Sequence, residues 1–173
     1  VGQVVDANLL ETMFHMMGPL VSLFGVTGEQ QRRLGAGLPY TVPRGTYRCS
    51  DDLWVAASTS SDSVAERVMH VLGVGDDPRF VNFAGRTEHR EELEQIMTAW
   101  CAARPRSDVI EAFTAADAAI GPVLDMADIA VDPHFANRGS IEVVDDDFNG
   151  TPMQSVIARL SATPGVIRWV GRG

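Results

Sequence analysis

Lysine is missing from this sequence of 173 residues, in which all fourteen basic residues are arginines. Enzymes that form a Schiff base with a substrate or with pyridoxal phosphate need a lysine amine. The phosphate-binding P-loop needs a lysine as well. These three kinds of chemistry are therefore excluded within the chain.

The 14 basic residues are outnumbered by 23 acidic ones, and the formal net charge is therefore -9 at pH 7. A surface that binds nucleic acid or an anionic membrane needs clustered positive charge. We therefore expect neither a nucleic acid nor a membrane among the partners of this protein.

Cysteine and histidine are few and scattered. Cys49 and Cys101 form no CxxC motif, and the four histidines show no HExxH spacing. The acidic run at residues 145–147 lacks the spacing and the closing Glu of a calcium loop. We expect no metal site. Since no secretory leader is recognisable, we expect a reduced, cytoplasmic protein without a disulfide.

Apolar residues, by contrast, make up 45% of the chain, enough for one domain with a real core. The pattern predicts a helix over residues 6–17, with Asp6 as its N-cap and one narrow polar stripe. A membrane span needs roughly 20 residues nearly free of charge, and Asp6, Glu11 and His15 interrupt this segment. The helix should therefore be buried on several sides, either within this domain or between this domain and another.

The remaining pattern predicts an α+β fold, a small antiparallel sheet with several packed helices. A hairpin is expected at residues 46–49 and 53–57, and a helix over residues 88–103. Two more helices should be capped by Ser63 and Ser107, and Asn149-Gly150 should form a turn between two extended segments. The glycines of RLGAGLP lack the strand and helix that a Rossmann motif requires.

The chain resembles the C-terminal half of the class III CoA-transferases in five phrases, which occur in the family's order: GQVVDANLLET, PRGTYRCSDDLWVA, GRTEHREEL, AIGPVLDMADIAVDPHFANRG and RLSATPG. This family includes formyl-CoA transferases, carnitine CoA-transferases and α-methylacyl-CoA racemases. The chain departs from the family at Asp52, where a Gly usually follows the Asp of the hairpin turn. Aspartate tolerates such turn conformations.

The resemblance implies an enzyme of two interlocked subunits, each with a Rossmann-like large domain and a small domain. In such enzymes the large domain binds CoA and carries a catalytic Asp. That Asp attacks the acyl-CoA thioester to give a mixed anhydride, and the CoA thiolate is then passed to another carboxylic acid. The racemases instead move the α-proton of the acyl group with an Asp and a His.

The resemblance also implies a division of this chain. Residues 1–30 would form the interdomain helix, residues 31–140 the small domain, and residues 141–173 the segment that returns to the large domain. We expect the catalytic Asp to lie outside the chain, so that the chain alone is an inactive fragment, and we assign no catalytic residue. A CoA-transferase, a racemase and a non-catalytic assembly or binding module remain the alternatives.

Gly35, Gly37 and Tyr40 are the candidate acyl-CoA-binding residues, because some family members place a glycine-rich loop over the active site here. Backbone amides of such a loop can approach an acyl group or an oxyanion. The alternative is a plain connecting loop. Arg86 and Arg90 either bind a carboxylate or phosphate, or are solvated arginines paired with neighbouring glutamates.

The expected partners are an acyl-CoA substrate, bound through the large domain, and a second copy of the chain in a homodimer. No cofactor is expected, since the CoA thioester is a substrate.

Overall fold

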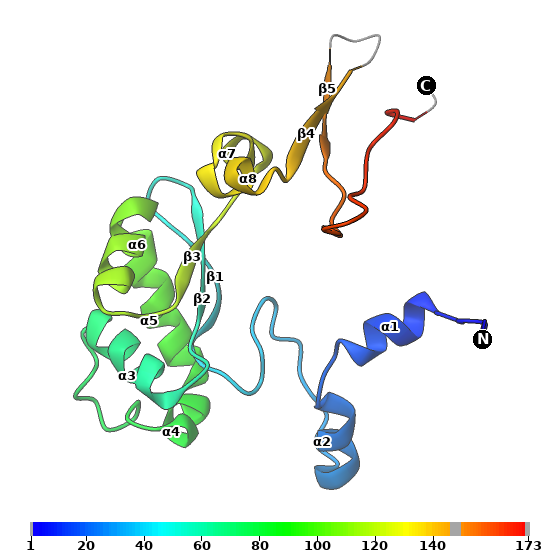
Figure 1. Ribbon diagram of the computed structural model, residues 1–173. Helices are drawn as coiled ribbons and strands as arrows, with labels where there is room; N and C mark the ends of the chain where they lie inside the picture. Colours follow the sequence, from blue (N-terminus) through cyan, green and yellow to red (C-terminus); the bar gives the residue numbers. More distant parts are fainter. Residues whose placement is uncertain (1, 146–149, 172–173) are drawn as a thin grey trace. The chain divides into compact units, whose positions relative to one another are not determined.

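The computed structural model describes residues 2–145 and 150–171. It forms two compact units, Val1–Gly121 and Pro122–Gly173. Within the described residues the chain has eight helices and five strands, and the strands form small sheets (Figure 1). The predicted α+β fold class is confirmed.

The first unit is built on a three-stranded sheet with the order β1-β2-β3. Strands β1 (Arg44–Arg48) and β2 (Trp54–Ser58) pair antiparallel, with Tyr47 opposite Val55, which confirms the predicted hairpin. Strand β3 (Ile120–Val123) follows β2 in the sheet, and Ser58 N donates to Ala119 O at 3.3 Å beside it. Tyr47 and Val55 are both buried, so this face of the hairpin carries the core.

The hairpin turn accommodates Asp52 in place of the glycine that is usual in the family. Asp52 has a φ of 64°, in the left-handed region that glycine adopts freely and that aspartate tolerates. Its carboxylate forms an ion pair of 2.7 Å with Arg48. The chain therefore keeps the turn without a glycine.

Helices α3 (Asp62–Val71), α5 (Arg90–Ala102) and α6 (Arg106–Ala115) lie on one side of this sheet (Figure 1). The short helix α4 (Phe83–Glu88) comes directly before α5 in the chain. Their buried side chains recur every three or four residues, which is the period of a helix with one apolar face. The core includes Tyr47, Val55, Val68, Met69, Phe80, Leu93, Met97, Cys101, Val109 and Phe113.

The three helices predicted after the hairpin are confirmed, but two of their caps are wrong. The N-cap of α3 is Ser61, whose side chain accepts a hydrogen bond from Val64 N, rather than Ser63. Helix α6 begins after Pro105 without a side-chain cap, rather than at Ser107. Proline before the first turn fits a helix start, because its missing N–H would have no partner inside the helix.

The opening residues form two helices, α1 (Leu9–His15) and α2 (Leu20–Thr27), and neither has a buried residue. The prediction of one helix capped by Asp6 is wrong, because the side chain of Asn8 accepts from Leu10 N at 2.8 Å and caps α1. Gly18, with a φ of 64°, and Pro19 then separate α1 from α2. In the described residues no single helix is long and apolar enough to cross a membrane, and α1 and α2 pass that test only as a pair bent by 68°.

The second unit contains α7 (Met126–Val131), α8 (Pro133–Arg138) and a hairpin of β4 (Ile141–Val144) and β5 (Thr151–Gln154). The side chain of Asp125 caps α7 and that of Asp132 caps α8. The pairing of β4 with β5 confirms the two extended segments expected here. Asp146, Asp147 and Asn149 lie outside the described residues, and so does the predicted turn.

Candidate functional site

The loop between α2 and β1 carries the three candidate acyl-CoA-binding residues. A Cβ on Gly37 would lie 3.2 Å from the carbonyl oxygens of both Leu34 and Arg44, so the backbone is closely packed at this point. Gly35 has a φ of 60° and open space around its Cα. The two glycines therefore serve different purposes, close packing at Gly37 and a left-handed conformation at Gly35.

Two cavities lie along this loop. One of about 320 Å³ is lined by Gly37, Tyr47 and Glu94 among others. The other, of about 850 Å³, is lined by Tyr40 together with residues of α4 and α5. Leu34 and Arg90 line both cavities, whereas Gly35 lines neither. The structure thus places Gly37 and Tyr40 at adjoining cavities and leaves Gly35 outside them.

Helix α5 holds this loop through two side chains, Arg90 and Glu94. The guanidinium of Arg90 donates from Nη2 to Pro39 O at 2.9 Å and from Nη1 to Thr41 O at 3.4 Å. The carboxylate of Glu94 accepts from Arg44 N at 3.1 Å and from the hydroxyl of Tyr47 at 2.7 Å. Because the two side chains are four residues apart, they lie on the same face of α5.

Arg86 is not the solvated arginine that its glutamate neighbours suggest. Its side chain is buried, with a residue exposure of 2%. Its guanidinium forms an ion pair with Asp62 and donates to Phe80 O at 3.2 Å. The interpretation as a solvated pair with adjacent glutamates is therefore wrong for Arg86. It is wrong for Arg90 as well, since that side chain binds backbone carbonyls.

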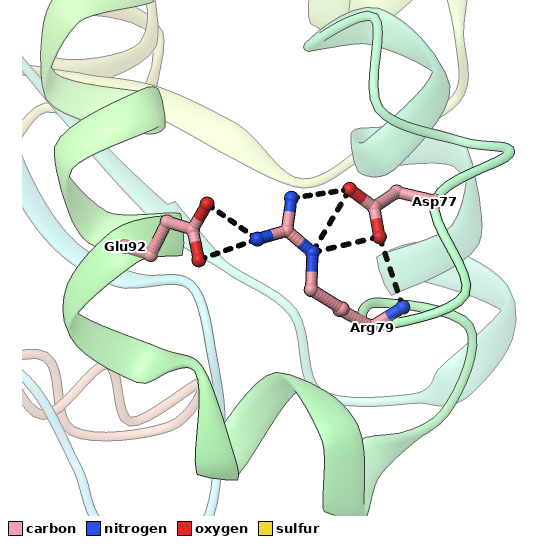
Figure 2. Close-up of polar contacts among 3 residues, drawn as sticks. All are labelled: Asp77, Arg79 and Glu92. Atoms are coloured by element: carbon pink, nitrogen blue, oxygen red, sulfur yellow. Dashed lines mark hydrogen bonds and ion pairs between the residues drawn. The ribbon is translucent and has the colours of Figure 1, made fainter.

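A charged cluster that sequence reasoning missed joins the segment before α4 to α5 (Figure 2). Arg79 Nη1 donates to both carboxylate oxygens of Glu92, at 2.7 and 2.8 Å, while its Nε and Nη2 donate to Asp77. The hydrogen bonds from Arg79 lower the pKa of Asp77 to about 2. Since the guanidinium is bonded on both sides, it stabilises the packing of this segment and is not available to a ligand.

The larger cavity combines apolar walls with a surplus of carboxylates. Leu23, Leu34, Tyr40 and Phe83 supply the apolar lining. The lining also includes four glutamates but only two arginines. A surplus of negative charge repels phosphate groups, whereas the apolar walls suit an acyl chain. Within the described residues, no group of three or more His, Cys, Asp or Glu side chains is arranged to hold a metal ion.

Known proteins resemble this chain over nearly its whole length. Its sequence matches CoA-transferase family III over residues 1–171. Succinyl-CoA–D-citramalate CoA-transferase from Chloroflexus aurantiacus is 31% identical over 98% of this chain and 43% of its own length. The alpha subunit of succinyl-CoA–L-malate CoA-transferase from the same organism is 28% identical, over 98% of this chain and 41% of its own length.

Solved structures share the fold. A CaiB/BaiF family protein from Brucella suis matches with a TM-score of 0.70 at 23% identity, over 94% of this chain and 43% of that one. Rv3272 from M. tuberculosis matches with a TM-score of 0.71 at 14% identity, over 95% of this chain and 43% of that one. The chain spans less than half the length of these curated relatives and solved structures. The resemblance found in the sequence is confirmed, and the chain belongs to CoA-transferase family III.

Proposed function

We propose that this chain is the small-domain part of an enzyme that transfers CoA between an acyl-CoA thioester and a carboxylic acid. The observation that carries the proposal is the family match over residues 1–171. The relatives that match 98% of the chain are named as CoA-transferases, which supports this reaction over racemisation.

In this proposal the loop that carries Gly35, Gly37 and Tyr40 contacts the acyl-CoA. Gly37 and Tyr40 line the two cavities, and the apolar walls around Tyr40 suit the acyl portion. The position of Gly35 outside both cavities makes its role conformational, because its left-handed φ sets the path of the loop.

The catalytic Asp lies outside the chain in this proposal, in the large domain that the family resemblance implies. Its carboxylate attacks the thioester carbonyl, expels the CoA thiolate and forms a mixed anhydride. The accepting carboxylate then displaces the donor carboxylate from this anhydride, and the CoA thiolate attacks the acceptor's carbonyl, which gives the acceptor's CoA ester and frees the Asp carboxylate. Two chains assemble as a homodimer in the cytoplasm, and the exposed apolar side chains of α1 and α2 support an assembly of this kind.

The test is an assay of the complete gene product, with succinyl-CoA as donor and D-citramalate or L-malate as acceptor, and with CoA esters separated by chromatography. Formation of the acceptor's CoA ester supports the proposal. Exchange of the α-proton of a 2-methylacyl-CoA for deuterium, without CoA transfer, favours the racemase alternative. If the protein catalyses neither reaction, the result favours an assembly or binding module.

A second assay tests the place of the catalytic Asp. The 173-residue chain alone should transfer no CoA above a mock-purified control, because a binding surface cannot replace the nucleophile. Turnover by the isolated chain would contradict this part of the proposal.

A further inference from the structure

The loop from Gly37 to Arg44 is bound to α5 in its middle and at its C-terminal end. Arg90 binds the carbonyl oxygens of Pro39 and Thr41, and Glu94 binds the backbone amide of Arg44. Both side chains are only partly exposed. Hydrogen bonds with a charged partner are stronger than neutral ones, especially where water has limited access.

The geometry of the Arg90 contact depends on the forked shape of guanidinium. Two nitrogens of one planar group reach two carbonyls that are two residues apart in the loop. A lysine ammonium is a point charge on a flexible stem and lacks this fork. Loss of the fork would leave two carbonyl oxygens without their charged donor. This part of the loop has little access to water, because Thr41 and Val42 are buried.

The same two side chains connect the loop to both cavities. Arg90 lines the two cavities, and Glu94 lines the smaller one together with Gly37. Tyr40 lies between the two carbonyls that Arg90 binds, so the conformation of residues 39–41 determines where its ring lies. The face of α5 that carries Arg90 and Glu94 is therefore coupled directly to the candidate binding residues.

We propose that Arg90 and Glu94 are positioning residues, which fix Gly37 and Tyr40 at the two cavities by holding the loop against α5. Their importance for substrate rests on the proposed function, in which this loop contacts the acyl-CoA. Their effect on the loop itself can be measured without any substrate.

The test of positioning is hydrogen exchange of the loop amides in the chain. In Arg90→Gln we expect the amides of Leu38, Tyr40 and Thr41 to exchange about ten-fold faster, since a glutamine cannot satisfy both carbonyls. Arg90→Lys should lie between the wild type and Arg90→Gln, because it keeps the charge without the fork. In Glu94→Gln the amide of Arg44 should exchange faster.

Matched controls separate this effect from general loss of stability. Arg67→Gln also removes an arginine that binds a backbone carbonyl, that of Asp117 at 3.0 Å, but on α3. Glu111→Gln makes the same change as Glu94→Gln at an exposed position of α6 that lines neither cavity. Both controls should leave loop exchange unchanged. Unchanged loop exchange in Arg90→Gln and Glu94→Gln would overturn the proposal, and if Arg90→Gln fails to fold, Arg90→Lys and Glu94→Gln decide it.

Kinetics of the complete gene product link positioning to substrate. We expect Arg90→Gln to raise KM for the acyl-CoA about ten-fold with a smaller change in kcat, Arg90→Lys to restore part of the loss, and Arg67→Gln to change neither. Faster loop exchange with an unchanged KM would support the positioning role and overturn the acyl-CoA contacts assigned under the proposed function. Failure of the positioning role and failure of the proposed acyl-CoA contacts therefore give different results.

Discussion

The hydroxyl of Tyr47 on β1 donates to the carboxylate of Glu94 on α5 at 2.7 Å, which joins the sheet to the helix beside the smaller cavity. Tyr47 is only 4% exposed. Burial, and then the negative charge of Glu94, raises the pKa of Tyr47 far above its usual range. The hydroxyl therefore stays protonated and continues to donate at neutral and mildly alkaline pH.

Tyr47→Phe should lower the free energy of unfolding by about 1–2 kcal/mol, because one oxygen of the partly buried Glu94 carboxylate loses its donor. Urea unfolding followed by tryptophan fluorescence measures the change. The matched control is Tyr40→Phe, since the hydroxyl of Tyr40 has no hydrogen bond within the described residues, and it should change stability by less than about 0.5 kcal/mol. Equal losses in the two variants would contradict the expected role of the Tyr47 bond.

Asp77 should make stability depend on pH in the acid range. Hydrogen bonds from Arg79 lower its pKa from 3.8 to about 2, so the folded chain binds fewer protons there than the unfolded chain. The stability that this carboxylate contributes is present above about pH 4 and is lost as the pH falls toward 2.

The corresponding variant is Asp77→Asn. We expect its urea midpoint to lie below that of the wild type near neutral pH, and the difference to shrink as the pH is lowered through this window. Asp76→Asn changes a neighbouring exposed carboxylate and should lower the urea midpoint near neutral pH less than Asp77→Asn does. A difference that stays constant with pH would contradict the assignment to Asp77.

The two thiols should be unreactive in the folded chain. Burial, and then the proximity of Cys49, raises the pKa of Cys101 to about 12. Burial, and then Asp51, raises the pKa of Cys49. Since the thiolate is the reactive form, a disulfide reagent at pH 8 should titrate the thiols only after urea is added. Ala102→Cys, at an exposed position of α5, should add one fast-reacting thiol, and a fast phase in the wild type would contradict the expectation.

Much of the fold could be predicted because its signals are local. The buried residues Leu93, Met97 and Cys101 of α5 recur every four positions, and alternation of buried and exposed residues marks β2. Cap residues were harder, because Ser61 and Ser63 both suit the N-cap of α3. Backbone geometry that a pattern does not specify decides between them.

The site could be predicted only in part, because its contacts join distant positions. Arg90 reaches Pro39 across 51 positions, and Arg86 reaches Asp62 across 24. Glutamates next to both arginines offered partners at helical spacing, but the tertiary fold directs Arg86 into the core. Gly37 and Tyr40 could be selected from the family resemblance, whereas nothing in the sequence pattern indicated that α5 holds their loop.

The apolar side chains of α1 and α2 predict self-association of the chain. Leu10 is 77% exposed and Phe14 is 54% exposed, and their apolar neighbours on both helices are uncovered as well. Exposed apolar surface costs about 25 cal/mol per Å², so covering a few hundred Å² stabilises an assembly by several kcal/mol. We expect a homodimer or higher oligomer in which residues 6–24 of one copy pack on another, measured by light scattering at micromolar concentration.

Leu10→Glu combined with Phe14→Glu should shift this assembly toward monomer, because each carboxylate would have to be desolvated in an apolar contact. The matched control is Gln95→Glu combined with Ala99→Glu, which places two carboxylates at the same spacing on exposed positions of α5. The control should leave the oligomer intact, since it adds charge without removing apolar surface. A monodisperse wild-type monomer with the amides of α1 protected from hydrogen exchange would show that the chain covers this helix by itself, and would contradict the prediction.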